Sequence, residues 1–453
     1  MTGSSEGSGV IAKLGPVARA ASAFIENART REYPADVIDL ARMCVADWHG
    51  VALGARGERA GESVREVVTA WGAPGRARML FGGTAPASMA ALVNGTYAHC
   101  LDFDDVHFPS LSHLSAPTWA AVLALGTEIG ADQRLMLSAF ITGFEIGARL
   151  GSGGIGEAAN ARGWHATGVV GRLSAAAAAS VLLGLDSMQA ANALGIAATQ
   201  TSGLVASFGT DAKPLHAGRA ASDGVFSAQL ARAGLRGATN LLDREDGLAR
   251  AVIQDGSVSM HLEGLDERWE IRRNALKPYA CCGFTHAPVD AGRQIHTQLS
   301  ASDIGKAVIH VHPLAPKVAG QTPVSPLAAK FSIAYCTALA LHGFRANAGD
   351  FSPERVKDCS LQELARKVEI VTHPEFAYEA AMLDVVTVDG RRLHANIPAS
   401  RGNPDNPMSW NDLEDKFLSL TEPLLAARAR PMFEALRAFG SEAQGVDLTT
   451  LTA

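Results

Sequence analysis

The spacing of hydrophobic residues changes once along this chain, near Trp269, and that change constrains the fold more than any other feature. From about residue 11 to residue 264, apolar residues recur every three or four positions, which is typical of helices. After Trp269, residues 306–312 and 368–373 instead alternate apolar and polar side chains, many of them β-branched, and they predict strands. The sequence therefore predicts a mainly α protein, with a large all-helical domain and a smaller α+β domain.

The helical spacing is clearest in five segments. It covers residues 37–48, 116–129, 132–150, 326–341 and 410–439. Small residues dominate residues 175–201 and would let helices approach one another closely. A glycine-rich loop is expected at residues 151–156, followed by a long helix over residues 166–183.

A hairpin and a cluster of turn residues define the domain boundaries that we expect. Asp389 and Gly390 separate two alternating runs within residues 384–397, which is a strong hairpin signal. Prolines and asparagines at residues 403–407 then precede the last helical segment. We expect residues 10–268 to form the helical domain, residues 269–402 the α+β domain, and residues 403–453 helices that rejoin the first domain. Residues 1–9, rich in Gly and Ser, are predicted to be a disordered tail.

The composition excludes several classes of protein. Of 453 residues, 47% are hydrophobic and 19% are charged, which is typical of a soluble globular protein. The net charge of −6 gives no reason to expect nucleic acid or an anionic membrane as a partner. No secretory signal is visible, and the alanine-rich stretch at residues 174–185 is too short to span a bilayer. The six cysteines form no CxxC pair, so we expect reduced thiols and a cytoplasmic location.

Residues 277–286 read Lys-Pro-Tyr-Ala-Cys-Cys-Gly-Phe-Thr-His and are the strongest local sign of a functional site. A cation opens this run at Lys277 and a titratable imidazole closes it at His286. Between them, Pro278 and Gly283 suit a tight backbone path lined with polar groups. An ordinary polar turn is the alternative.

A second run, residues 101–113, supplies carboxylates and imidazoles that Lys277 could act beside. Asp102, Asp104 and Asp105 would repel one another unless they are solvated, bound to a metal or paired with cations. Three interpretations stay open: a metal site, an exposed acidic helix end, or a carboxylate that orients a proton-transferring imidazole.

Three further segments carry candidate residues. His165 precedes the helix expected at residues 166–183, where free N–H groups favour anions, although a packing role is the alternative. Lys213, His216 and Arg219 concentrate potential cations that would bind an anion or lie on a solvated surface. Tyr335 is expected on a helix, packed in the core or with its hydroxyl directed to a substrate carboxylate.

Several common catalytic motifs are absent from the sequence. There is no Walker A loop, no HExxH and no GxSxG. The glycines at residues 151–156 do not follow a predicted strand, so a dinucleotide-binding interpretation fails.

At the candidate residues described above, the chain resembles the MmgE/PrpD family. The resemblance covers residues 10–440, and its segments occur in the same order as in the family. The similar segments are Asn94–Thr96, Ala98–His99, Leu101–Asp105, His113–Pro117, Gly143–Arg149, Gly163–His165, Lys277–His286 and Ala329–Tyr335. The resemblance implies a cofactor-free homodimer with a helical and an α+β domain and an active site between them. Family activities are 2-methylcitrate dehydration, cis-aconitate decarboxylation and iminodisuccinate epimerisation, and Gly163–His165 and the Lys277 run look closest to cis-aconitate decarboxylases.

The resemblance also implies the site residues and the chemistry. Six residues match pocket positions of decarboxylase-like members: Asp102, His113, His165, Lys213, Lys277 and Tyr335. Six more are expected to bind substrate: His107, His216, Arg219, Cys281, Cys282 and His286. Two departures are Val106, where some decarboxylases have a threonine, and Leu114, where a proline is usual.

We therefore expect a metal-independent lyase that acts on a small anionic polycarboxylate. In it, His113, oriented by Asp102, would transfer a proton while Lys213 and Lys277 stabilise the charge that develops. The alternatives are an epimerase of an iminodisuccinate-like compound, a metal-dependent hydrolase or hydratase using Asp102, Asp104 and His107, and a silent ligand-binding protein.

Overall fold

An alanine-rich helix, α8 (Ala166–Leu183), forms the centre of the helical part, and nearly all of its residues are buried. In this computed structural model, which describes residues 14–242, 244, 246–253 and 262–441, α8 packs against α5 (Ser115–Ile129), α6 (Gln133–Leu150) and α10 (Ala212–Arg232). Small residues allow these close contacts. A Cβ atom added to Gly143 would lie 2.6 Å from the carbonyl oxygen of Ser174.

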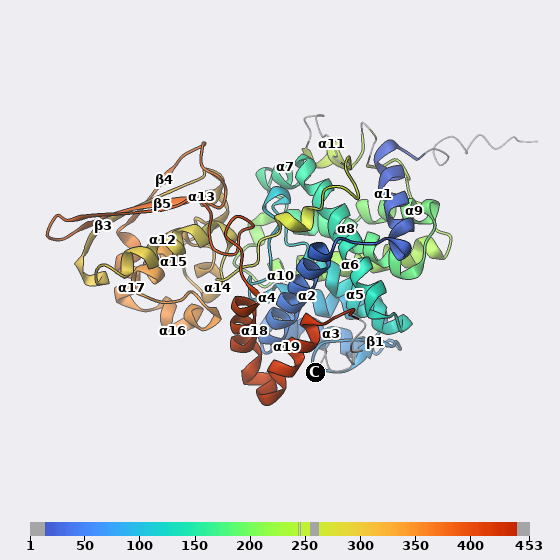
Figure 1. The fold of residues 1–453 in the computed structure, drawn as a ribbon, viewed down its shortest axis with the longest axis horizontal. Coiled ribbons are helices and arrows are strands. Elements are labelled where there is room, and N and C mark those ends of the chain that lie inside the picture. The colour runs from blue at the N-terminus through green and yellow to red at the C-terminus, as the bar shows by residue number, and fades with distance from the viewer. Residues whose placement is uncertain (1–13, 243, 245, 254–261, 442–453) are drawn as a thin grey trace, which may run out of the picture.

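The remaining helices of this part surround that centre (Figure 1). They are α1 (Pro16–Glu26), α2 (Ala35–Gly54), α3 (Arg59–Trp71), α4 (Ala87–Cys100), α7 (Gly156–Ala161), α9 (Ser187–Ala198) and α11 (Leu248–Ile253). The short strands β1 (Ala77–Arg78) and β2 (Thr84–Ala85) pair antiparallel. The helices predicted over residues 37–48, 116–129 and 132–150 are confirmed as α2, α5 and α6.

Residues 151–156, predicted to be a glycine-rich loop, form a kinked helical connection in which the backbone angles of Gly154 are not helical. A π-helical turn, Gly151–Ile155, joins α6 to α7. Close packing explains the glycines. A Cβ atom at Gly156 would meet the carbonyl oxygen of Ser110 at 1.9 Å, and Gly154 has a φ of 105°.

The small-residue segment at residues 175–201 is also divided. It holds the end of α8 and the whole of α9, and Gly184 separates the two in a left-handed conformation that favours glycine.

The α+β part is built on a sheet with the strand order β4-β3-β5-β6. The strands are β3 (Ile304–Val311), β4 (Val368–Thr372), β5 (Ala381–Thr387) and β6 (Arg392–Ile397). Strands β3 and β4 are parallel, and the other pairs are antiparallel. The predicted strands are confirmed, as is the hairpin around Asp389 and Gly390.

Helices cover one face of this sheet (Figure 1). Helix α12 (His286–His296) contacts β5 and β6, and α15 (Ile333–Leu341) contacts β4 and α17 (Cys359–Arg366). The shorter helices are α13 (Leu314–Ala319), α14 (Pro326–Ala329) and α16 (Pro353–Val356). Buried and half-exposed residues alternate over most of β5, as expected when one sheet face is covered.

The single helix predicted at residues 326–341 is wrong, because α14 and α15 are separate. Ser332 caps α15 by accepting a hydrogen bond from the Tyr335 amide at 3.4 Å, so its own backbone is extended and not helical. Phe331 therefore lies in the break and does not share a helix with Tyr335.

The last helices pack against the first part of the chain. Helices α18 (Trp410–Leu425) and α19 (Ala429–Arg437) both contact α2. They lie within the helical spacing of residues 410–439, and Ala426 adopts a φ of 48° between them. The predicted boundaries at residues 268/269 and 402/403 stay predictions, and the predicted tail at residues 1–9 lies outside the described residues.

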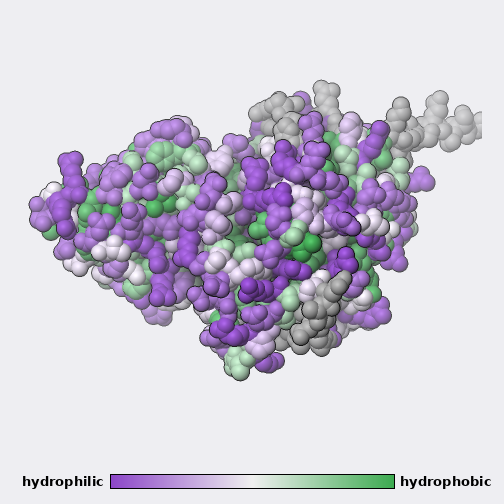
Figure 2. All heavy atoms as spheres, viewed as in Figure 1, coloured by the Kyte–Doolittle hydropathy of each residue, from purple (hydrophilic) through white to green (hydrophobic). Residues whose placement is uncertain are grey.

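Within the part of the chain that the structure describes, α8 is long and apolar enough to cross a membrane by length and composition alone. In the fold, 94% of it is buried, as in the core helix of a globular protein. The face shown in Figure 2 is mostly hydrophilic, with hydrophobic residues in scattered groups. The predicted fold class, mainly α with a smaller α+β part, is confirmed.

Candidate active site

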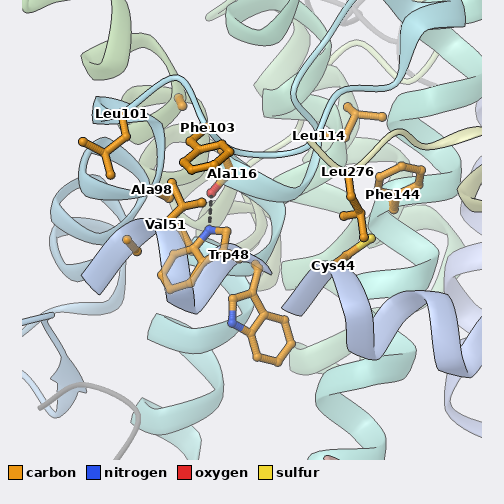
Figure 3. Close-up of a cluster of buried hydrophobic side chains, with 14 of the residues drawn as sticks. Cys44, Trp48, Val51, Ala98, Leu101, Phe103, Leu114, Ala116, Phe144 and Leu276 are labelled. Carbon is orange, nitrogen blue, oxygen red and sulfur yellow. Dashed lines mark hydrogen bonds between the residues drawn. The ribbon is translucent and has the colours of Figure 1, made fainter. Parts of the chain in front are cut away.

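The acidic run lies in an irregular loop after α4, and its side chains alternate between apolar and polar surroundings. Leu101 and Phe103 lie in the apolar cluster around Trp48 (Figure 3). Asp102 and Asp104 are fully buried but make polar contacts instead. Asp102 has a φ of 53°, a left-handed conformation that non-glycine residues rarely adopt.

Three buried lysines hold this loop by its backbone. Lys330, Lys277 and Lys416 donate hydrogen bonds to the successive carbonyls of residues 101, 102 and 103, at 2.5, 2.9 and 2.7 Å. The carbonyl groups of this loop have no hydrogen-bond partner in a helix or strand, and buried ammonium groups need hydrogen-bond acceptors. The lysines and the carbonyls therefore satisfy one another's hydrogen-bonding groups. Segments far apart in the sequence thereby fix the conformation around Asp102.

Asp102 forms the lysine half of the site, together with Lys213 and Lys277. Its carboxylate makes an ion pair with Lys213 and lies 3.3 Å from the Lys277 Nζ atom. Burial opposes ionisation of Asp102, but the two ammonium groups outweigh it and hold the pKa well below the usual value. Burial likewise opposes the charge on Lys277, yet Asp102 raises the pKa of that lysine. The structure therefore brings both predicted lysines to one carboxylate.

Asp104 forms the histidine half, together with His99 and His113. Its Oδ2 atom lies 2.8 Å from His99 Nδ1 and 3.2 Å from His113 Nδ1. Burial lowers the pKa of His113, and it lowers that of His99 to about 3, so both imidazoles are neutral at pH 7. Burial opposes ionisation of Asp104 as well, but the imidazoles hold its pKa well below the usual value.

This arrangement corrects the role expected for Asp102. The carboxylate beside His113 is Asp104, because both carboxylate oxygens of Asp102 face lysines. With Nδ1 of His113 directed to Asp104, we assign its proton there, which leaves Nε2 as the basic nitrogen.

His165 extends the histidine half. It precedes α8 directly, as predicted, and its ring stacks on His99 with centroids 5.8 Å apart. Its Nδ1 atom lies 3.0 Å from Nδ1 of His216. Burial lowers the pKa of His165 well below the usual value and that of His216 to about 4. Neither ring adds a positive charge at neutral pH.

A cavity connects the two halves and lies where the helical and α+β parts meet. It holds about 510 Å³ of space that no atom occupies, part of it open to solvent. The lining residues are Asp102, Val106, Phe108, Leu111, His113, Asn160, His165, Phe208, Lys213, Cys282, Gly283, Phe284, Leu314, Val318 and Phe331. Five of the twelve predicted site residues are in this lining, and Lys277 contacts Asp102 directly behind it.

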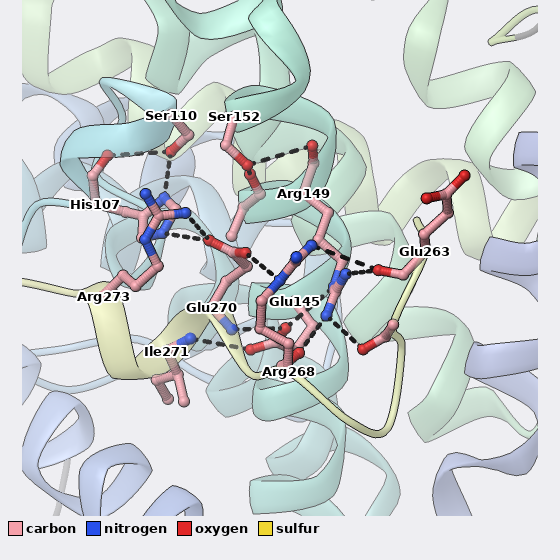
Figure 4. Close-up of polar contacts among 12 residues, drawn as sticks. His107, Ser110, Glu145, Arg149, Ser152, Glu263, Arg268, Glu270, Ile271 and Arg273 are labelled. Atoms are coloured by element: carbon pink, nitrogen blue, oxygen red, sulfur yellow. Dashed lines mark hydrogen bonds and ion pairs between the residues drawn. The ribbon is translucent and has the colours of Figure 1, made fainter. Parts of the chain in front are cut away.

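Two predicted residues lie away from the cavity. Tyr335 is fully buried near the start of α15, with its ring 6.2 Å from that of Phe351. His107 is directed to Glu270, at 3.3 Å, and to Ser110, at 2.9 Å, within a polar network on the other side of the loop (Figure 4).

Other predicted substrate-binding residues are also engaged elsewhere. Arg219 is half-exposed and pairs with Asp223. His286 contacts the carbonyl oxygen of Cys281 at 3.1 Å, and the Cys281 thiol accepts a hydrogen bond from Thr285. Cys282 does line the cavity, but burial raises the pKa of its thiol to about 12, so it is not a thiolate at neutral pH.

Sequence reasoning missed four residues that shape the site. His99 had no assigned role, although it precedes Asp104 by five residues at the end of α4. Asn160 lines the cavity from α7. Lys330 and Lys416 hold the loop, and no local signal marks them, since Lys416 follows Glu414 and Asp415 in an ordinary amphipathic helix and Lys330 directly follows α14.

The structure does not support a metal site at the three residues suggested by the sequence. Asp102 pairs with Lys213, Asp104 contacts His99, and His107 contacts Glu270, so these three side chains form no common site. Among the described residues, His99, Asp104 and His113 have ligand atoms within 4.8 Å of one another and could hold a metal ion.

Family models match two successive parts of the chain. Residues 19–261 match the MmgE/PrpD N-terminal domain, and residues 279–438 match the MmgE/PrpD C-terminal domain. The chain is 29% identical over 434 residues to a cis-aconitate decarboxylase of Aspergillus terreus, covering 88% of this chain and 87% of that protein. It is also 29% identical over 359 residues to the human cis-aconitate decarboxylase, covering 75% of this chain and 74% of that protein.

Proposed function

Because the chain belongs to the MmgE/PrpD family, we propose that it is a lyase that decarboxylates a small polycarboxylate related to cis-aconitate. One observation carries the proposal: one ammonium group and a neutral, carboxylate-oriented imidazole line one cavity between the two parts of the chain, and a second ammonium group lies directly behind it. The relatives named cis-aconitate decarboxylase support the choice of decarboxylation.

In this proposal the lysine half binds the anionic substrate. Lys213 lines the cavity, and Lys277 adds a second positive charge behind Asp102. An ammonium group has three donors, so Lys213 can hold Asp102 and still bind a substrate carboxylate. A net positive charge stays next to that carboxylate.

The histidine half handles the proton. The bond between a substrate carbon and its carboxylate breaks, CO2 leaves, and the electron pair stays on the carbon skeleton, delocalised towards a remaining carboxylate. Lys213 and Lys277 stabilise that negative charge. An imidazolium at His113, protonated as substrate binds, delivers the proton that completes the product, and Asp104 stabilises the charged ring meanwhile.

The test is turnover by the purified full-length chain, followed by NMR in D2O. The panel holds cis-aconitate, methylcitrate, iminodisuccinate and tartrate. We expect loss of CO2 from cis-aconitate with deuterium incorporated at one product carbon. Lys213→Met should abolish most of this activity, and Arg219→Met, which removes an exposed cation of the same helix, should not.

Two results would contradict the proposal. Dehydration or epimerisation without loss of CO2 would keep the site and change the reaction. Tight binding with neither turnover nor proton exchange would favour a silent ligand-binding protein. A homodimeric assembly, a cytoplasmic location and independence from metal stay predictions, and light scattering of the purified protein tests the first.

A further inference from the structure

The cavity has two chemically different walls. Asp102, His113, His165 and Lys213 form a polar wall on one side. The other residues are mostly apolar, and eight of them have aliphatic or aromatic side chains. These are Val106, Phe108, Leu111, Phe208, Phe284, Leu314, Val318 and Phe331. We call the part formed by Val106, Phe108, Phe284, Leu314 and Val318 the apolar wall.

The apolar wall joins a small separate cluster to the edge of the main core, because Phe284 belongs to the main core and Leu314 and Val318 pack against it. Val106 and Phe108 form a small apolar cluster with Ala275 and Tyr378, separate from the large core cluster. Phe284 extends it from the α+β part, with its ring 6.3 Å from Phe108 and 6.1 Å from Tyr378. The lining therefore includes a continuous apolar surface to which both parts of the chain contribute.

Helix α13 closes the apolar wall. Leu314 and Val318 lie one turn apart on this helix and are only half-buried, so apolar surface stays open towards the cavity. No cation lies among the lining residues on this side. A carboxylate placed there would lose its hydration without gaining a partner, which is strongly unfavourable.

We infer that the substrate carries an alkyl substituent of several carbons, which lies along the apolar wall while its carboxylates face the lysines. This inference rests on the proposed function and names the substrate class more narrowly than a small polycarboxylate. An extended alkyl chain matches a wall that offers dispersion and desolvation but no polar partner.

The expected effect follows from the transfer of methylene groups out of water. Each buried methylene should raise kcat/KM roughly fourfold until the wall is filled. Across four added methylenes the gain should be on the order of 10².

The experiment uses the full-length protein and a series of cis-aconitates that carry hydrogen, methyl, propyl or pentyl on one carbon. Loss of CO2 is measured for each compound. A rise in kcat/KM from methyl to pentyl supports the inference. If cis-aconitate reacts and the longer compounds react equally or more slowly, the inference is overturned but the proposed function stands. If no compound loses CO2, the proposed function itself fails.

Two variants locate the effect. Leu314→Arg puts a cation on the apolar wall and should reduce the pentyl-to-methyl ratio at least tenfold. Lys317→Met is the control, because Lys317 is exposed on the same helix and is not in the lining, and it should leave the ratio unchanged. Val318→Thr, which keeps the branched shape of the side chain but adds a hydroxyl to a half-buried position, covers the case in which Leu314→Arg fails to fold, and it should lower the ratio about threefold. An unchanged ratio in both folded wall variants would contradict the inference.

Discussion

The lysine half and the histidine half of the site are built around two carboxylates only two positions apart, yet they are electrostatically different. Asp102 faces two ammonium groups, and Asp104 faces two neutral imidazoles. Both carboxylates are buried, and both have a lowered pKa. One loop thereby separates a fixed positive charge from groups that exchange protons.

The electrostatic difference between the two halves arises from the lysines and histidines beside the carboxylates and not from the carboxylates themselves. A lysine beside a carboxylate stays charged throughout the physiological range, so the lysine half offers a constant field for an anion. A buried imidazole loses its charge, since burial lowers the pKa of both His99 and His113. The histidine half can therefore accept a proton only when something stabilises the charged ring, such as Asp104 or an anionic substrate.

The most damaging change is expected in the histidine half. His113→Gln keeps a polar side chain of similar length but cannot titrate near neutral pH. If His113 transfers the proton, kcat should fall by about 10²–10⁴-fold. His394→Gln is the control, because His394 is half-exposed on β6, outside the cavity. Near-normal kcat in His113→Gln would assign the proton to another group, with His165 the next candidate.

A change in the lysine half should affect mainly kcat/KM, whereas the change in the histidine half affects kcat. Lys277→Met keeps the length of the side chain but removes the charge beside Asp102. Substrate affinity and stabilisation of the developing charge should both decline, so kcat/KM should fall by about 10²–10³-fold. A companion variant, Lys306→Met, removes an exposed lysine of β3 and should change nothing. An unchanged kcat/KM in Lys277→Met would contradict the anion-binding role that we assign to the lysine half.

Sequence reasoning predicted the elements well wherever the pattern was periodic. The strands, the hairpin and the long helices follow from spacing that a single segment carries. The breaks at Ser332 and Ala426 were missed, because each depends on a local backbone conformation inside a segment with helical spacing. The helical turn at Gly151–Ile155 depends on close approach to Ser110, which no local pattern reveals.

The site was predicted in part for a similar reason. Lys277 and the residues of the 101–113 run were found because unusual residue types are adjacent there. Which aspartate faces the lysines and which faces His113 depends on contacts between residues more than 100 positions apart, such as Asp102 with Lys213. The direction of His107, away from the cavity to Glu270, is set by the fold in the same way.

The role of Asp104 can be separated from that of Asp102. Asp104→Asn keeps the shape but removes the charge beside His99 and His113. We expect kcat to fall by about 10–100-fold, because the imidazolium that forms at His113 is no longer stabilised by a negative charge. Asp104 raises the pKa of His113, so its loss should also move the imidazole-dependent limb of the pH–rate profile to lower pH. An unchanged profile would show that Asp104 only supports the fold.

The two halves should also respond to acid at different pH values. The pKa of His99 is about 3 in the fold, against an ordinary value near 6.5, so the unfolded chain binds more protons between these values. Stability should therefore fall as the pH drops below about 6.5, by about 1.4 kcal/mol per pH unit for each such imidazole.

Asp102 contributes in a lower range. Its pKa is lowered from 3.8, so its stabilisation is complete above that value and is lost only at more acidic pH. Thermal unfolding between pH 7.5 and 4.5 reports the buried imidazoles together with Asp105 and Glu145, whose pKa values of about 7 give an opposite slope, so only a comparison with a variant isolates the histidine half. His99→Gln should flatten the dependence in this window, and His394→Gln, which changes a half-exposed imidazole outside the cavity, should not. Equal slopes in the wild type and His99→Gln would contradict the assignment.

The smallest expected effect is that of a chelator. It tests whether the positive charge used in the reaction comes from the lysine half or from a metal ion in the histidine half. His99, Asp104 and His113 could together hold a metal ion, so a metal-dependent reaction would place its cation in the histidine half. In the proposed reaction the positive charges are instead Lys213 and Lys277. Dialysis against EDTA should then change kcat/KM by less than about twofold, as assayed before and after addition of Zn²⁺, Mg²⁺ or Mn²⁺. Loss of activity that one of these ions restores would assign the reaction to a metal in the histidine half. His113→Gln should in that case also lower the metal content of the purified protein, whereas Lys277→Met should leave it unchanged.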